Sequence, residues 1–79
     1  AIIKVLNHLQ EVDRRKLFVD LGFSTLMKYM VGSLGYTEAE SYLRIQAMRV
    51  MVKIPEVRNK IEEGKMSLSN AATLPIKFR

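Results

Sequence analysis

The sequence contains no cysteine and no tryptophan, one histidine, four glycines and two prolines in 79 residues. The absence of cysteine excludes disulfides and every zinc or iron–sulfur site that depends on cysteine ligands. Small secreted domains are usually held together by disulfides, so this absence favours a cytoplasmic protein. Uninterrupted apolar runs are only a few residues long, whereas a membrane-spanning helix needs about 20. We therefore expect no membrane association through a spanning helix.

Hydrophobic residues make up 48% of the chain, which is enough for a packed core and too many for a disordered segment. The length corresponds to one domain, so we expect residues 1–79 to form a single helical domain. The chain begins at Ala1 without an initiator methionine and ends at Arg79 without a closing cap, which suggests a fragment of a longer protein. The net charge of +5 favours acidic partners such as nucleic acid.

The N-terminal third predicts one or two helices. Apolar residues at helical spacing predict a first helix over residues 2–12. Asp13 is positioned to cap a second helix over residues 14–21, with Gly22 after its end. A single longer helix over residues 2–21 is the alternative.

A third helix is predicted over residues 25–34, capped by Ser24 or Thr25. Gly32 weakens this helix but also allows a neighbouring helix to approach closely. The helix ends at Gly35. Its predicted apolar face consists of Leu26, Met27, Met30, Val31 and Leu34.

The strongest local signal is the capping box of Thr37 and Glu40, in which each side chain accepts a hydrogen bond from the backbone N–H of the other residue. It predicts a fourth helix that runs to Ile54 and is stopped by Pro55. The predicted core side contains Ala39, Leu43, Ala47, Val50, Met51 and Ile54, and further apolar residues (Ile45, Met48 and Val52) widen it. The helix is therefore expected at the centre of the fold. Its remaining face carries Glu38, Tyr42, Gln46, Arg49 and Lys53.

A fifth helix is predicted over residues 55–63, with Val57 and Ile61 facing the core and Gly64 after its end. A sixth, capped by Ser67, is predicted over residues 68–74 and is closed by Pro75. The fold class is thus all-α, a compact bundle of five or six short helices.

Residues 26–52 also have the outline of a helix-turn-helix-like pair. In the usual motif the second helix carries apolar residues at its fourth and seventh positions. Counted from Glu38, these positions are Ser41 and Arg44, whereas Tyr42 and Ile45 follow one residue later. Either the turn is one residue longer than usual or the motif is absent.

The residues of an enzyme site are missing from the sequence. There is no cysteine nucleophile and no glycine-rich phosphate loop. His8 has neither a second histidine nor a carboxylate at the spacing of a metal site, and we interpret it as a partly exposed helix residue. We expect no catalysis, no metal and no cofactor in this fragment.

The basic residues of interest fall into two groups. Arg49 and Lys53 share a predicted helix face with Gln46, and these types suit guanine edges, phosphates and adenine edges respectively. Arg14, Arg15 and Lys16 form a cluster near a helix junction and, with Arg44, are candidate phosphate contacts. Tyr42 is expected to pack against a neighbouring helix, although stacking on a base or sugar is the alternative.

Several stretches together resemble a known family: residues 9–18 (LQEVDRRKLF), 22–26 (GFSTL), 34–42 (LGYTEAESY), 44–47 (RIQA), 54–56 (IPE) and 63–69 (EGKMSLS). They occur in order over nearly the whole chain, which resembles the helical N-terminal region of bacterial HNH-endonuclease-like proteins. The resemblance implies a nuclease module downstream, with paired histidines and a metal. None of those residues is present here, so the resemblance implies no nuclease activity for this fragment.

Two stretches of the second half, Ile54-Pro55-Glu56-Val57 and residues 63–67 (EGKMS), are also similar to the central DNA-binding region of ParB-type partition proteins. There they follow the recognition helix, which implies that the fourth helix here is the recognition element. This sequence departs from that family because apolar residues occupy most of the circumference of the fourth helix, which leaves few residues free to read bases.

Two hypotheses follow from the sequence. The first is a cytoplasmic DNA-binding module that recognises duplex DNA and is accessory to a downstream nuclease domain. The alternative is an interaction module that forms a homodimer or docks a downstream domain without touching DNA. Five methionines and the broad apolar surface of the fourth helix support the alternative, because methionine-rich faces adapt to partners.

Overall fold

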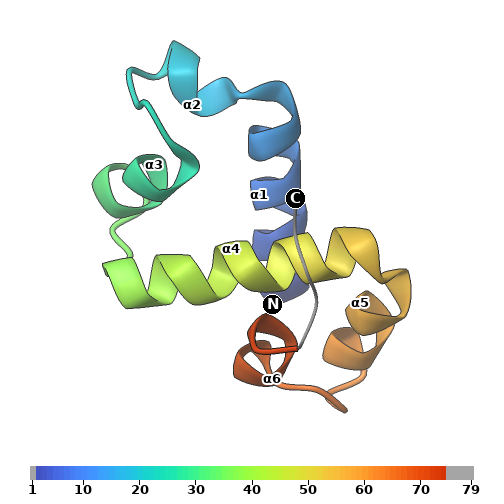
Figure 1. Ribbon diagram of the computed structural model, residues 1–79. Helices are drawn as coiled ribbons and strands as arrows, with labels where there is room; N and C mark the ends of the chain where they lie inside the picture. The colour runs from blue at the N-terminus through green and yellow to red at the C-terminus, as the bar shows by residue number, and fades with distance from the viewer. Residues whose placement is uncertain (1, 75–79) are drawn as a thin grey trace.

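The computed structural model describes residues 2–74, which contain six helices and no strand. The helices are α1 (Ile2–Arg15), α2 (Leu17–Asp20), α3 (Leu26–Gly32), α4 (Glu38–Lys53), α5 (Pro55–Glu62) and α6 (Leu68–Ala72) (Figure 1). The radius of gyration is 12.2 Å, close to the value of about 12 Å expected for a folded domain of this length. The predicted all-α bundle of short helices is confirmed.

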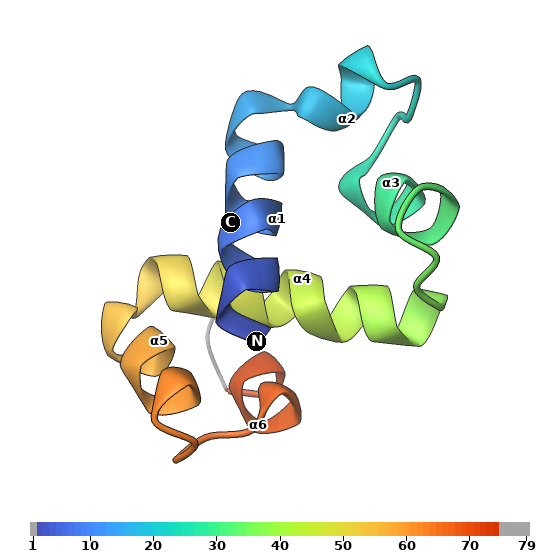
Figure 2. The same ribbon diagram turned by 180° about the vertical axis from the view of Figure 1, so that it is seen from behind.

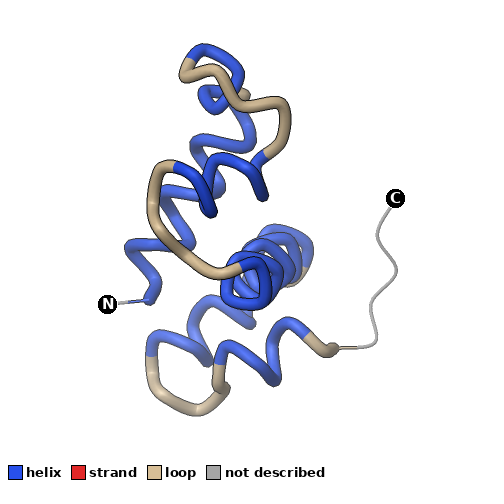
Figure 3. The backbone as a smooth tube through the Cα atoms, turned by 90° about the vertical axis from the view of Figure 1, so that its left-hand side faces the viewer, coloured by secondary structure: helices blue, strands red, loops and turns tan. Residues whose placement is uncertain are grey.

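Helix α4 lies at the centre, as predicted. It packs against α1, α3, α5 and α6. Figure 2 shows α1 crossing α4 steeply, and Figure 3, which looks along α4, shows α3 on one side of it and α5 and α6 on the other. Six residues of α4 are buried: Ser41, Ile45, Ala47, Met48, Val50 and Met51. Because these residues point in many directions around the helix, the core surrounds α4 on most of its circumference.

The N-terminal caps of α3, α4 and α6 form where the sequence predicts them. At α4 the Thr37 hydroxyl accepts from the Glu40 backbone N–H at 3.1 Å, and a Glu40 carboxylate oxygen accepts from the Thr37 N–H at 2.9 Å. The Thr25 hydroxyl caps α3 and the Ser67 hydroxyl caps α6 in the same way, each at 3.1 Å. These bonds satisfy backbone donors that have no partner within the helix.

The first two helices meet at a different residue from the one predicted. Neither one continuous helix nor a cap at Asp13 is formed: α1 continues to Arg15, and the break falls at Lys16. Lys16 adopts the left-handed conformation, with φ of 54°, and gives α2 no side-chain cap. Apolar periodicity gives no signal for this break, because Leu17 and Phe18 continue the helical pattern.

Two glycines end helices in the predicted way. Gly22 and Gly64 have φ of 91° and 76°. The N–H of Gly22 bonds to the carbonyl of Val19 at 3.0 Å, and that of Phe23 bonds to Phe18 at 2.9 Å. The same pair of bonds follows α5, from Gly64 and Lys65 to carbonyls one turn earlier. This is the Schellman arrangement, which favours glycine because the left-handed conformation is costly for other residues.

Gly32 permits a close approach, but of a loop side chain rather than a helix. A Cβ at this position would lie 2.7 Å from Cε1 of Phe23. The Phe23 ring in turn meets the buried Tyr29 ring edge-on, with centroids 5.8 Å apart. The Tyr29 hydroxyl lies 3.2 Å from Nε2 of His8, whose side chain is otherwise exposed as predicted.

Some boundaries and faces depart from the prediction. Helix α3 is shorter than residues 25–34, and α4, α5 and α6 end one or two residues early. In α3 and the turn after it, Val31 and Leu34 are exposed rather than part of the core, and in α4 Ala39 is exposed. The predicted stop at Pro75 lies outside the described residues.

Helices α3 and α4 form the helix-turn-helix-like pair, joined by residues 33–37. Figure 1 shows α3 nearly end-on while α4 lies across the view, so their axes cross steeply. The fourth and seventh positions of α4 do turn inward: Ser41 is fully buried and Arg44 is half-buried. The longer-turn alternative is met only in part: Ile45 is 6% exposed, as that alternative requires, but Tyr42 is 55% exposed. Neither alignment therefore places a buried apolar residue at both positions of the motif.

Candidate nucleic-acid interface

One side of α4 is accessible, and it carries the predicted recognition residues. Tyr42, Gln46, Arg49 and Lys53 follow one another at spacings of three or four residues, so they lie on one side of the helix. We call these four residues the α4 strip. Tyr42, Arg49 and Lys53 are exposed and Gln46 is half-buried. The expectation that Tyr42 packs against a neighbouring helix is wrong, because its side chain is exposed among the residues that the structure describes.

A hydrogen bond joins the first two residues of the α4 strip. Nε2 of Gln46 donates to the Tyr42 hydroxyl at 3.4 Å, a long contact near the surface. It leaves the Gln46 carbonyl oxygen and a second N–H unused. Gln46 therefore retains the donor and acceptor that the edge of an adenine base requires.

Arg44 does not join the α4 strip. It lies about 200° around the helix from Gln46, because each residue turns an α-helix by about 100°. Its guanidinium stacks over the Tyr36 ring, 4.5 Å from the centroid, and Nη1 donates to the Glu40 carbonyl at 3.2 Å. Nε is buried without a partner. Arg44 thus fastens the α3–α4 turn to α4 and is poorly placed to contact the same ligand as the α4 strip.

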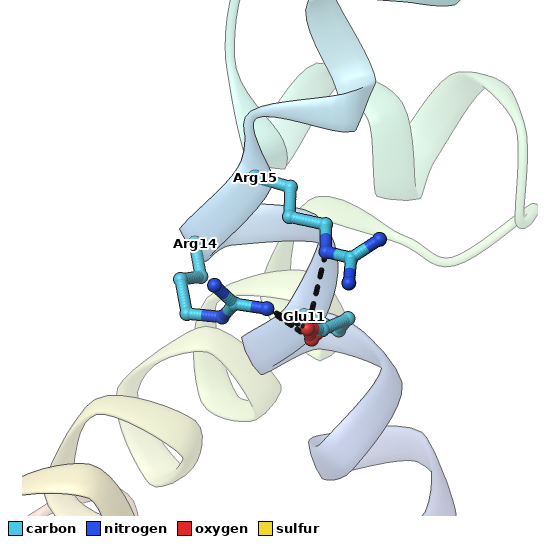
Figure 4. A network of polar contacts seen from close by, with 3 residues as sticks. All are labelled: Glu11, Arg14 and Arg15. Atoms are coloured by element: carbon cyan, nitrogen blue, oxygen red, sulfur yellow. Dashed lines mark hydrogen bonds and ion pairs between the residues drawn. The ribbon is translucent and has the colours of Figure 1, made fainter.

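Arg14 and Arg15 surround a single carboxylate at the end of α1. Nη2 of Arg14 donates to both oxygens of Glu11, at 2.9 Å to Oε2, and Nε of Arg15 lies 3.4 Å from Oε1 (Figure 4). The hydrogen bond from Arg14 lowers the pKa of Glu11, and the charges of both arginines add to this effect. Both guanidiniums stay more than half exposed. The carboxylate offsets part of the charge that these residues would offer to a phosphate.

The two basic groups lie apart. Figures 1 and 2 both show α1 crossing α4 with its N-terminal part, while the end that carries Arg14, Arg15 and Lys16 stands away from α4. The seven candidate residues therefore divide into three places: Gln46, Arg49 and Lys53 on the α4 strip, Arg44 against Tyr36, and the cluster at the end of α1.

The charge of α4 is uneven along its length. Its first turn carries Glu38 and Glu40, and its last turn carries Lys53. Hydrogen bonds from the Thr37 backbone N–H and then from its hydroxyl lower the pKa of Glu40 and favour its charged form. The N-terminal end of α4 would therefore repel a phosphate, whereas the C-terminal half of the α4 strip would attract one.

Within residues 2–74, no group of three or more acidic or histidine side chains is arranged to hold a metal ion. A search of the same residues finds no helix long and apolar enough to cross a membrane. A shallow pocket of about 310 Å³ lies beside Asn59, Glu62 and Glu63, at the end of α5. Two of its three lining residues are carboxylates, which do not attract a nucleic acid.

Comparison of the chain with protein-family models, curated proteins and solved structures finds no match. The resemblances to HNH-endonuclease-like and ParB-type proteins therefore stay predictions.

Sequence reasoning missed the partner of Arg44. A signal was present, since Tyr36 lies eight residues before Arg44 and the turn at Gly35 brings the chain back toward α4. This signal was not recognised because an arginine is assigned to the solvent-exposed surface when only its charge is considered. The burial of Tyr29 was missed for a similar reason, because its neighbours Met27 and Met30 account for the apolar face of α3.

Proposed function

We propose that this domain binds duplex DNA through the α4 strip. The observation that carries the proposal is that a side of α4 left open by the neighbours described, within residues 2–74, presents Gln46, Arg49 and Lys53 together with Tyr42. Arginine and glutamine suit base edges, and lysine suits phosphates. The net charge of +5 supports the same function, because a net positive charge attracts a polyanion.

The helix-turn-helix-like pair supports α4 as the recognition element, with one difference from the usual docking. Recognition helices generally contact bases with their N-terminal residues. Here that end carries Glu38 and Glu40, which repel phosphates. The approach that fits the charges brings the C-terminal half of α4 to the groove, with Arg49 nearest the base edges and Lys53 at the backbone.

A salt titration tests this proposal. We would measure the fluorescence anisotropy of a labelled mixed-sequence duplex at several salt concentrations, with the wild type and with Arg49→Gln/Lys53→Gln. Binding should weaken steeply with salt, because phosphate contacts release counterions. The double variant should lose affinity by roughly tenfold or more. The slope of the logarithm of the binding constant against the logarithm of the salt concentration should fall in magnitude by about two.

Lys4→Gln/Lys65→Gln is the matched control, because it removes the same charge from exposed positions elsewhere. If both pairs weakened binding equally, the contact would be a general charge effect and the α4 strip would not be the site. Absence of binding even at low salt would remove the DNA function and leave an interaction module.

The accessory role extends this proposal to a longer protein. On the resemblance to HNH-endonuclease-like proteins, we propose that the domain delivers a downstream nuclease module to DNA in the bacterial cytoplasm. A longer protein that carries Arg49→Gln/Lys53→Gln should keep its metal-dependent cleavage chemistry but need more enzyme to cut a dilute duplex. Equal cleavage at every protein concentration would contradict the accessory role.

The alternative of an interaction module has support from a different surface than the sequence indicated. Met30, Met48 and Met51 are buried, and Met27 and Met66 pack against the core, so the methionines offer no exposed face. The most exposed large apolar residues are Leu21 and Val19, which lie in and beside α2.

A further inference from the structure

Helix α2 packs against α1, and Figures 1 and 2 show it at the end of the molecule farthest from α5 and α6. Phe18 is buried, but Val19 is 56% exposed and Leu21, directly after the helix, is 60% exposed. Two large apolar side chains thus stand in solvent at this corner, one within α2 and one directly after it.

Opposite charges flank these apolar residues. Lys16 comes directly before α2 and Asp20 is its last residue. Both are exposed, and neither forms an ion pair within residues 2–74. They lie four positions apart in the sequence. A second α2 placed antiparallel to the first would therefore bring the lysine of each copy opposite the aspartate of the other copy.

This corner carries no net charge, in contrast to the chain as a whole. Between residues 11 and 21 there are three acidic residues (Glu11, Asp13 and Asp20) and three basic ones (Arg14, Arg15 and Lys16). A chain of net charge +5 repels its copies over most of its surface. At the α2 corner, by which we mean Lys16, Val19, Asp20 and Leu21, two copies would approach without that repulsion.

We propose that the α2 corner is a contact between two copies of this chain, related by a two-fold axis. Val19 packs against the same residue of the second copy, and Leu21, which points to a different side of α2, borders the contact. Lys16 of each copy pairs with Asp20 of the partner subunit, and the two-fold axis makes this pairing twice. The proposal does not depend on DNA binding, because it uses no residue of the α4 strip.

The contact is small, and this sets its strength. Stable dimers bury about 1,200–2,000 Å² in total, whereas the α2 corner offers two exposed apolar side chains per copy. The dimer is therefore weak and forms only at high protein concentration. Two copies held on one duplex would associate more readily, since binding to the same DNA raises their effective concentration.

Sedimentation equilibrium and an NMR dilution series test the contact on the whole chain. The average mass should rise from the monomer value toward twice that value as the protein approaches millimolar concentration. The amide shifts that change on dilution should belong to residues around α2. Val19→Ser should reduce the association, whereas Val52→Ser should not, although Val52 is equally exposed at 53%.

A charge exchange provides the sharper test. Lys16→Glu and Asp20→Lys should each be more strongly monomeric than the wild type, because each brings like charges together in its own dimer. An equimolar mixture of the two variants should associate again, because both cross-pairs become attractive. Unfolding cannot produce such a recovery, and circular dichroism of each variant checks the helix content.

Three results would overturn the proposal. The first is a strict monomer at millimolar concentration. The second is association whose dilution shifts lie on α4, α5 or α6. The third is a mixture of the two charge variants that stays monomeric while each variant remains folded. A chain that binds DNA but stays monomeric would contradict only the α2 contact, and a dimer that ignores DNA would contradict only the α4 strip.

Discussion

Helices α4 and α2 are both rich in apolar residues, but these residues are buried to different extents in the two helices. Helix α4 has a complete capping box and neighbours on most of its sides, so most of its apolar residues are buried. Helix α2 is four residues long, has no side-chain cap and leaves Val19 in solvent. The comparison teaches that local apolar content does not decide burial in this fold. What decides burial is whether other helices cover the element, and α1, α3, α5 and α6 all pack against α4.

The largest effect expected from this comparison is in core truncation. Met48→Ala in α4 should lower the free energy of unfolding by about 2–5 kcal/mol, since it leaves a cavity among α4's neighbours. Val19→Ala in α2 should change it by less than about 0.5 kcal/mol. Urea unfolding followed by circular dichroism measures both. If Met48→Ala does not fold, Ile45→Val, at about 1 kcal/mol, replaces it. Equal costs for the α4 and α2 changes would contradict the difference in packing.

The terminal glycines sharpen the same contrast. Gly64→Ala should cost about 1–2 kcal/mol, because alanine must adopt the left-handed conformation after α5. Gly22→Ala should cost less, since α2 can fray locally while the rest of the fold stays intact. Hydrogen exchange at the amides of Phe23 and Lys65 separates the two cases. Loss of protection throughout the chain in Gly22→Ala would show that α2 belongs to the global core.

Removing the cap of α4 should cost about 1 kcal/mol. Thr37→Ala deletes the hydroxyl that accepts from the Glu40 N–H. Thr37→Ser is the matched control, because it retains the hydroxyl and should lose far less stability. Thermal unfolding measures both variants. The capping box would be energetically unimportant if alanine and serine behaved alike.

A stabilising change is expected at the start of α2. Lys16 holds a left-handed conformation that is costly for a residue with a Cβ. Lys16→Gly should therefore raise the free energy of unfolding by about 0.5–1 kcal/mol. Arg15→Gly, one residue earlier and inside α1, should have the opposite sign because glycine disfavours helix. A destabilised Lys16→Gly variant would show that the break between α1 and α2 lies elsewhere.

The smallest effect concerns acid stability. The pKa of Glu40 is lowered in the folded chain, whereas that of an unfolded glutamate is about 4.3. The stability that its charge contributes is complete above about pH 4.3 and is lost as the pH falls through the lowered folded value. Glu40→Gln should therefore lose less stability than the wild type on going from neutral pH to acid. Urea midpoints across that range test this, and parallel pH profiles would contradict it.

Much of the fold follows from local signals that the sequence displays. Hydroxyl caps at Thr25, Thr37 and Ser67 and glycines after α2 and α5 are properties of a few neighbouring residues, so they can be recognised without knowing the tertiary structure. The same is true of the central place of α4, because apolar residues on most of its circumference require several neighbours.

The rest depends on contacts between distant residues. The break at Lys16 is a backbone conformation that no residue type there requires. The exposure of Tyr42 depends on the absence of a helix over one side of α4. The α4 strip was predictable as a helix face, whereas the removal of Arg44 from it required knowledge of where Tyr36 lies after the turn.

The most direct test of the central claim is an NMR titration of the labelled chain with a short mixed-sequence duplex at low salt. We predict that the largest shifts fall on the amides and side chains of Gln46, Arg49 and Lys53. Shifts centred on Arg14, Arg15 and Lys16, or no shifts at a saturating duplex concentration, would contradict the assignment of α4 as the DNA-binding element.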